Sequence, residues 1–214
     1  FDEVLKRATY GDRTLFAAAQ AGHVENFVDT LLWIAVPLYV VSKGLDIAAV
    51  GVVVGVHSAM YFLQIATGGL ADRIGRRPPV ILGMFTAGAG VLGLVLVEGY
   101  LLWAVFAGVS GLGMALLYPN LMTVPSDAAH PTWRSAGMGV YRMWRDSGYA
   151  VGAVVIGVSM EFVNAEAAFY VTAGLMFLSG AVVYLWMEET HPEFGTHEPP
   201  VPASARAETV VTED

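Results

Sequence analysis

Six apolar stretches, each about as long as a membrane-spanning helix, run through this chain of 214 residues. A bilayer core is about 30 Å thick, so a helix needs about 20 predominantly apolar residues to cross it. Only 14% of the residues are charged, well below the ~25% of an ordinary soluble protein. The sequence therefore predicts an all-α, polytopic membrane protein with transmembrane helices at residues 21–41, 47–70, 79–97, 100–122, 137–160 and 167–187.

The basic residues predict how the chain is oriented in the membrane. Short cytoplasmic segments retain Lys and Arg, whereas segments on the opposite side are poor in them. Apart from Lys43, the basic residues lie before the first stretch, between the second and third, around the start of the fifth, or after the sixth. We therefore expect both ends of the chain to be cytoplasmic. The basic residues on this side are Lys6, Arg7, Arg13, Arg73, Arg76, Arg77, Arg134, Arg142, Arg145 and Arg206.

The predicted helix bundle, residues 21–187, lies between two polar ends. Residues 1–20 are expected to form a cytoplasmic linker with amphipathic character, and residues 188–214 a disordered acidic tail rich in Pro, Glu, Ala and Thr. The chain opens with Phe1 on a mixed, charged segment that does not resemble a secretory signal peptide. We expect the chain to be part of a longer protein.

Several classes of function lack the residues that they need. The chain has no Cys, which excludes disulfides and cysteine metal sites. Its formal net charge of -8 argues against a nucleic-acid partner, which requires clustered Lys and Arg. No GxxxxGK[ST], HExxH or GxSxG pattern occurs. We therefore expect no enzymatic activity, no cofactor and no metal, and any transport would draw on an ion gradient.

The connection between the second and third stretches carries a distinctive motif, GGLADRIGRR at residues 68–77. A glycine permits close helix approach, and an aspartate among arginines can form ion pairs that break and re-form. A basic cytoplasmic loop would by itself account for the arginines, but not for the glycines and the aspartate at this spacing. The motif resembles the signature loop of the major facilitator superfamily. The resemblance implies a conformational latch formed by Gly68, Asp72, Arg73, Gly75, Arg76 and Arg77.

Two further regions extend the resemblance over roughly residues 8–187. Residues 117–149 resemble the tenth-to-eleventh helix region of a prokaryotic branch of that superfamily, and the first stretch resembles its seventh helix. The fourth stretch lacks the arginine that is common in the fourth helix of first halves. The resemblance therefore implies the C-terminal six-helix half, a 3+3 inverted repeat, of a twelve-helix transporter. The N-terminal half of the same transporter would be its partner.

A charged cluster opens the fifth stretch and is followed by small residues. Arg142, Arg145 and Asp146 precede Gly148 and Gly152, a spacing typical of tight helix contact. An arginine at this depth could instead reach lipid phosphates. The symmetry implied by the resemblance adds these three charged residues to the latch. It pairs Arg142 and Arg145 with the signature loop of the other half, and pairs Asp72 and Arg76 with groups in that half.

Polar side chains inside the apolar stretches mark a candidate pathway, because exposing them to lipid is costly. The third and sixth stretches contain nothing more polar than Thr, Ser and Tyr, so we expect them to face lipid. Asp29 either binds a cation or a coupling proton, or is a structural carboxylate. His57 either relays protons or is hydrogen-bonded to a neighbour. The candidate pathway residues are Asn26, Asp29, Trp33, His57, Tyr61, Gln64, Tyr118 and Asn120.

Together these features predict a secondary active transporter of a small solute, coupled to protons and working by alternating access in a cell membrane. Its expected partners are the solute, protons, the lipid bilayer and the N-terminal half. One alternative is a membrane-embedded solute sensor or scaffold without turnover. Another is an intramembrane enzyme, which would require several catalytic side chains at one depth of the membrane.

Overall fold

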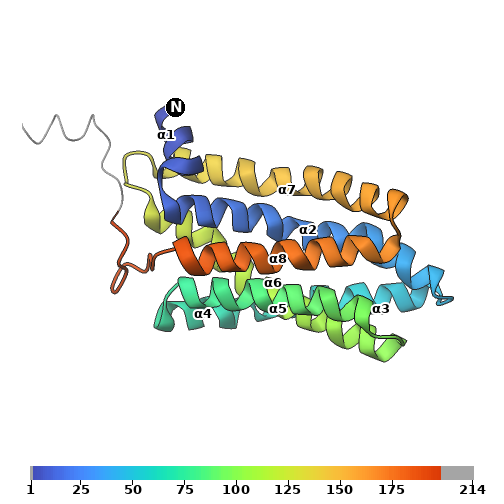
Figure 1. Cartoon of the computed structure of the whole chain (residues 1–214). Helices are drawn as coiled ribbons and strands as arrows, with labels where there is room; N and C mark the ends of the chain where they lie inside the picture. Colours follow the sequence, from blue (N-terminus) through green and yellow to red (C-terminus); the bar gives the residue numbers. More distant parts are fainter. Residues whose placement is uncertain (1, 199–214) are drawn as a thin grey trace, which may run out of the picture.

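The computed structural model describes residues 2–198, which form helices and their connections without any strand. The long helices run back and forth, and the connections after α4 and α6 lie at the same end of the bundle as α1 (Figure 1). The elements are α1 (Asp2–Lys6), the π-helical turn η1 (Arg7–Gly11), α2 (Arg13–Ser42), α3 (Ile47–Ala59), the 3-10 turn η2 (Met60–Leu63), α4 (Gln64–Ile74), α5 (Arg77–Leu96), α6 (Tyr100–Ala128), α7 (Arg134–Phe162) and α8 (Ala165–Trp186).

Three of the long helices begin at a side chain that caps their first turn. Asp12 accepts a hydrogen bond from the backbone N–H of Leu15 at 2.9 Å, at the start of α2. Asp46 does the same for α3, and Asn164 for α8. Such caps satisfy N–H groups that have no partner within the helix, so they define where these helices start.

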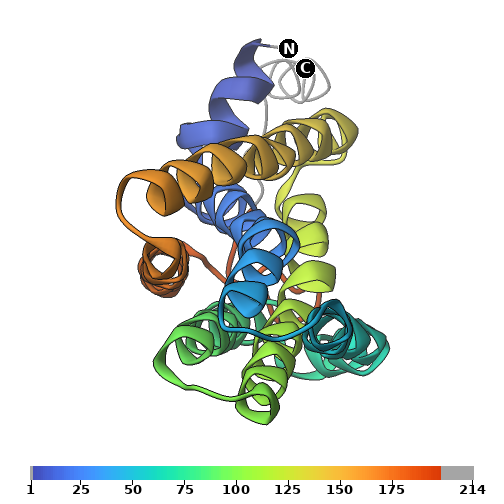
Figure 2. The ribbon, with the colours of Figure 1, turned by 90° about the vertical axis from the view of Figure 1, so that its right-hand side faces the viewer.

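The helices form two groups of three. Figure 2 looks along the helices and shows α2, α7 and α8 in one group, with α3–α4, α5 and α6 in the other. Within and between these groups, α2 packs on α7 and α8, and α5 packs on α6 and α8. The contact surfaces are apolar, and the largest side chains that are almost completely buried include Leu31, Met84, Leu117, Phe169 and Met176.

All six predicted stretches are helical, which confirms the all-α fold class. At one end of the bundle the helices continue beyond the predicted limits: α2 begins at Arg13, α4 ends at Ile74 and α6 ends at Ala128. This is the end that carries the arginines of the signature loop. Hydropathy ends a stretch at the first charges, whereas backbone hydrogen bonding continues past them into a polar environment.

Five helical segments among residues 2–198 are long and apolar enough to cross a membrane. They are α2, the continuous segment 47–74, α5, α6 and α8. The remaining long helix, α7, has 29 residues but contains Arg142, Arg145 and Asp146. Those charges lower its apolar character, and they are also the reason that the helix is of functional interest.

The helices differ in how much of their surface the chain itself covers. In the most apolar 18-residue stretch of segment 47–74, only 17% of the residues are buried, whereas 61% are buried in the corresponding stretch of α5. The helices predicted to face lipid, α5 and α8, lie side by side on one flank (Figure 2). Large apolar side chains are exposed on these two helices, for example Leu82 and Leu185, and also on the segment 47–74, for example Phe62 and Ile65. This segment therefore presents a wide apolar surface that no other part of residues 2–198 covers.

Candidate functional site

Asp29 lies in α2 where it meets two other predicted spans, and only 8% of the residue is exposed. The hydroxyl of Tyr61, in η2, donates to Asp29 Oδ1 at 2.6 Å. The hydroxyl of Tyr149, in α7, donates to Oδ2 at 3.2 Å. Each oxygen of this carboxylate thus accepts a hydrogen bond from a different element, so Asp29 connects the two helix groups.

His57 extends this network into the interior and is 2% exposed. Its Nε2 lies 3.2 Å from the Tyr61 hydroxyl and 3.8 Å from Asp29 Oδ1. Its Nδ1 lies 3.3 Å from the backbone carbonyl oxygen of Ala107. A carbonyl oxygen can only accept, so Nδ1 carries a hydrogen and the state of Nε2 is set by Tyr61 and Asp29. We refer to Asp29, His57, Tyr61 and Tyr149 as the Asp29 network.

The second predicted span is not one regular α-helix. The turn η2 interrupts it at Tyr61, the residue that connects Asp29 to His57. A 3-10 turn in the middle of a helix often marks a hinge at a functional site. Neither Pro nor Gly occurs in this turn, so the sequence did not predict the break.

Two aromatic residues border the Asp29 network on its exposed side. The rings of Trp33 and Tyr149 are stacked, with centroids 5.9 Å apart and an interplanar angle of 6°. Trp33 is 62% exposed. Tyr118 is also exposed, and the guanidinium of Arg145 lies 5.0 Å from its ring centroid. Trp33 and Tyr149 thus place a partly open aromatic surface beside the buried carboxylate, and Tyr118 lies against Arg145.

Glu25 is a candidate functional residue that was not predicted from the sequence. It lies one helical turn before Asp29 and is completely buried, with Oε2 3.3 Å from Arg145 Nε. Arg145 also forms an ion pair with the exposed Asp146 at 3.3 Å. The second oxygen of Glu25, Oε1, has no hydrogen-bond partner in the described part of the chain. Its position four residues before Asp29 in an apolar stretch was the signal that could have identified it.

The position of Arg145 differs from our expectation that it reaches outside this chain. It is 9% exposed and lies against α2, where its backbone carbonyl accepts a hydrogen bond from Asn26 Nδ2 at 2.7 Å. Close packing of α7 on α2 is the cause, because a Cβ at Gly148 would overlap the backbone carbonyl of His23. The tight contact predicted at Gly148 and Gly152 is thereby confirmed, and Arg142 stays exposed.

Besides Asn26 and Tyr118, which lie against Arg145, two further predicted pathway residues do not join the Asp29 network. Asn120 is 1% exposed, and its Nδ2 donates to the carbonyl of Leu116 in the same helix. Gln64 is half-buried and opens α4, directly after η2. The structure therefore unites Asp29, His57 and Tyr61, with Trp33 beside them, but places these two amides elsewhere.

The signature loop joins α4 to α5 and contains a chain of ion pairs. Arg76 Nη1 lies 2.7 Å from Asp72 Oδ1, and Arg76 Nε lies 3.4 Å from Asp127 Oδ2 in α6. Asp72 and Arg76, expected to pair outside this chain, thus have partners within it. Arg73 is exposed, and a Cβ at Gly68 would meet nothing within 4 Å among the described residues. Gly68 therefore makes no close helix contact within this part of the chain.

Gly75 is required where it stands for two reasons. Its φ of +97° strains any residue with a side chain. A Cβ there would also overlap the carboxylate of Glu189, which accepts hydrogen bonds from the backbone N–H groups of Arg76 at 2.8 Å and Arg77 at 3.1 Å. Glu189 thus caps the start of α5 from beyond the end of α8. Arg77 Nη2 donates to the carbonyl of Tyr184 at 2.6 Å.

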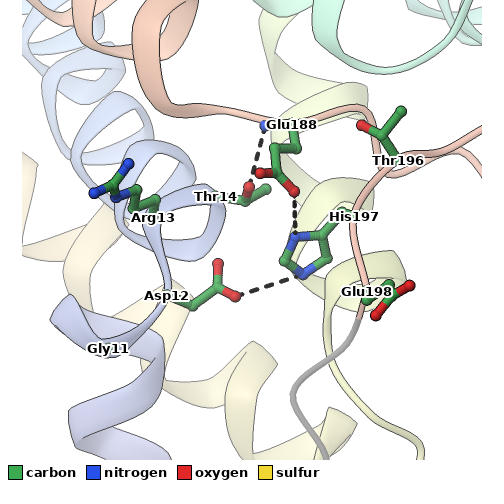
Figure 3. A pocket seen from close by; sticks show the side chains of 8 residues that line it. All are labelled: Gly11, Asp12, Arg13, Thr14, Glu188, Thr196, His197 and Glu198. Carbon is green, nitrogen blue, oxygen red and sulfur yellow. Dashed lines mark hydrogen bonds and ion pairs between the residues drawn. The ribbon is translucent and has the colours of Figure 1, made fainter.

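The described part of the predicted tail, residues 188–198, contacts the end of the bundle. Figure 3 shows His197 between two carboxylates at the edge of a surface pocket of about 390 Å³. His197 Nε2 lies 3.6 Å from Asp12 Oδ2, and Nδ1 lies 3.5 Å from Glu188 Oε2. The backbone N–H of Glu188 donates to Thr14 Oγ1 at 3.1 Å. Residues 199–214 lie outside the described part of the chain.

The acidic and imidazole groups do not converge on a metal site. Within residues 2–198 no group of three or more His, Asp or Glu side chains is arranged to hold a metal ion. The side chains of the Asp29 network can form hydrogen bonds, carry charge and move protons.

Comparison with known proteins identifies similar chains. A family model described as the Major Facilitator Superfamily matches residues 21–211. The uncharacterized MFS-type transporter YhjO of Bacillus subtilis is 25% identical over 143 residues, covering 67% of this chain and 35% of that protein. The inner membrane transport protein YajR of Escherichia coli is 23% identical over 193 residues, covering 90% of this chain and 40% of that protein.

Solved structures of transporters share this fold. A crystal structure of the peptide transporter POT in complex with sulfate is 26% identical with a TM-score of 0.75, over 94% of this chain and 44% of that chain. A POT family transporter in complex with 5-aminolevulinic acid gives a TM-score of 0.72 at 19% identity, over 94% of this chain and 44% of that chain. This chain spans well under half the length of each of these relatives.

Proposed function

Because this multi-pass membrane protein belongs to the Major Facilitator Superfamily, a family of transporters rather than enzymes, we propose that it serves proton-coupled secondary transport of a small solute by alternating access. We further propose that it acts as the C-terminal six-helix half, beside an N-terminal half that covers the exposed face of α3–α4. Both ends of the segment would then be cytoplasmic, as the distribution of its arginines predicts.

The observation that carries proton coupling is the chain of hydrogen bonds from Asp29 through Tyr61 to His57. The Tyr61 hydroxyl has one hydrogen, so it donates either to Asp29 or to His57. If it donates to Asp29 and accepts a hydrogen bond from His57 Nε2, His57 bears hydrogens on both ring nitrogens and is positively charged, and Asp29 is negatively charged. If it donates to His57 Nε2, His57 is neutral and Asp29 carries the proton.

These two arrangements contain the same number of protons and keep every hydrogen bond. A proton can therefore pass between Asp29 and His57 by reversing the Tyr61 hydroxyl, without breaking the contact between the two helix groups. Loss of the proton from the network leaves one net negative charge in a low-dielectric site, which favours a different arrangement of the surrounding helices. The 3-10 turn η2 would act as the hinge of this change, within the second span.

Collapse of the proton gradient tests this function directly. We expect solute uptake into liposomes containing the full transporter to fall to the passive rate after an uncoupling ionophore is added, since the energy source is then gone. A panel of labelled solutes that includes a dipeptide is suitable, because one structural relative is a peptide transporter. Uptake that continues unchanged against a concentration gradient would contradict proton coupling. Binding without turnover under any gradient would favour the sensor alternative.

Asp72→Ala tests the proposed latch. The Asp72 side chain of the Asp72–Arg76 ion pair is 65% exposed. Solvent-exposed ion pairs contribute only about 0.5 kcal/mol to the free energy of folding. We therefore expect the thermal unfolding temperature in detergent to stay unchanged while the transport rate falls at least about tenfold, because the charge pairs bias one conformation. Normal transport by a correctly inserted variant would rule out the latch.

A further inference from the structure

A groove of about 460 Å³ lies between the outer half of α2 and α3, on the surface that the chain leaves uncovered. Its lining is apolar and carries no charged residue; it includes Trp33, Pro37, Val50, Gly51, Val54 and Gly55. A Cβ at Gly51 or Gly55 would meet nothing within 4 Å among the described residues. The two glycines thus leave this wall open to a compact apolar group.

One end of the groove leads to the Asp29 network. Trp33 follows Asp29 by four residues on the same face of α2, which places the carboxylate about 6 Å along the helix axis from the Trp33 position. Trp33 is 62% exposed and rests on Tyr149, the residue that donates to Asp29. A ligand in the groove would therefore contact the indole face and lie close to the carboxylate.

The charges around this end favour a positive ligand. Arg145 is offset by Glu25 and Asp146, each at 3.3 Å. At the outer end of α2, Lys43 is paired with Glu166 at 3.5 Å. The groups that contact Asp29 itself are the neutral hydroxyls of Tyr61 and Tyr149, with His57 Nε2 at 3.8 Å.

The net charge of the Asp29 network therefore depends on whether the coupling proton is bound. With the coupling proton the network of Asp29 and His57 is neutral, and without the proton it carries one negative charge. Arg145 and Lys43, the two cations named above, each already have an acidic partner within residues 2–198. A cation in the groove would supply a compensating positive charge at the moment the proton leaves.

We propose that this groove binds organic cations, in which a compact apolar body carries a delocalised or quaternary positive charge. The inference rests on the proposed transport function, since it names the class of solute that would reach the groove. Such a cation needs no hydrogen-bond partner. It is stabilised by the face of Trp33 through a cation–π contact and by the charge of Asp29.

Tetraphenylphosphonium and tetraphenylborate test the proposal, because the two ions have nearly the same size and shape and opposite charge. We expect the full chain in lipid nanodiscs, after subtraction of binding to empty nanodiscs, to bind the cation at least about tenfold more tightly than the anion. A tenfold difference corresponds to about 1.4 kcal/mol, within the range of one cation–π contact.

Three variants separate charge from shape. Asp29→Asn is expected to remove most of the preference for the cation and to leave the binding of tetraphenylborate unchanged. Gly51→Leu should weaken the binding of both ions by filling the groove. Gly174→Leu is the matched control, because a Cβ at Gly174 in α8 also meets nothing within 4 Å but lies outside the groove. It should change neither affinity.

Equal binding of the two ions, or a cation preference that survives Asp29→Asn, would overturn the proposal. Either result would indicate that the groove binds its partner by apolar contact alone, as a lipid acyl chain or a second copy of the chain would be bound. Binding is measured without any gradient, so it is independent of proton coupling. Selective cation binding together with ionophore-insensitive transport would support the cation groove and contradict proton coupling. Equal binding of the two ions together with ionophore-sensitive transport would support proton coupling and contradict the cation groove.

Discussion

Replacing Asp29 with Asn is expected to abolish proton-driven transport while leaving the bundle folded. The amide keeps one oxygen as an acceptor for Tyr61 or Tyr149, but it cannot take up or release a proton in the working pH range. A positioned proton-transfer group typically contributes a factor of 10²–10⁴ to the rate of its step. We therefore expect active transport to fall by about 100-fold or more.

The decisive measurement compares two modes of transport in the same liposomes. Net uptake driven by a proton gradient should be lost in Asp29→Asn, whereas exchange of labelled for unlabelled solute without a gradient should persist at saturating solute concentration, since exchange requires no change of protonation. Glu166→Gln is a matched control, because it removes one carboxylate from the first turn of α8, beside Lys43 and away from the Asp29 network. Gradient-driven uptake by Asp29→Asn at the rate of the unaltered protein would exclude Asp29 as the coupling residue.

Arg145→Met is expected to cause the largest loss of stability of any single substitution considered. It leaves the carboxylate of Glu25 completely buried with no cation beside it, because Arg145 is the only ion-pair partner of Glu25 in residues 2–198. Removing one partner of a buried ion pair typically costs about 3–5 kcal/mol. The free energy of unfolding in mixed detergent micelles should fall by about that amount.

A double substitution distinguishes the loss of the pair from damage to packing. Glu25→Met with Arg145→Met removes both charges and keeps apolar volume at the α2–α7 contact, so it should recover most of the lost stability. If the double variant is as unstable as Arg145→Met alone, the cost lies in packing, for example in the contact of Arg145 with Tyr118. Recovery of stability without recovery of transport would assign the pair a role in the transport cycle.

The helices themselves could be predicted because their cause is local. A run of about 20 apolar residues between charges and turn residues is enough to predict a membrane helix, whatever it packs against. The limits were less accurate at the arginine-bearing end, where α2 begins at Arg13 rather than at residue 21. The interruption at Tyr61 was not foreseen, because no residue type in η2 requires it.

The candidate site could be predicted only in part. Spacing along one helix indicated that Asp29 and Trp33 share a face, and that His57 and Tyr61 share another. It carried no information on the hydrogen bond between Asp29 and Tyr61, which requires α2 and η2 to meet at one depth. Tyr149 was missed for the same reason, since an ordinary tyrosine on α7 becomes relevant only when α7 packs closely on α2.

Six helical stretches, an arginine-rich end and membership of a transporter family could be read from the sequence, because hydropathy, charge and a compact motif are properties of neighbouring residues. Which charges are paired became known from the packing of the helices. Arg145 turned from an expected external contact into the partner of Glu25, and Glu189 became the cap of α5 across Gly75. The physical reason is that hydrogen bonds and ion pairs act over about 3 Å, so they depend on helix depth and rotation that no single stretch of sequence specifies.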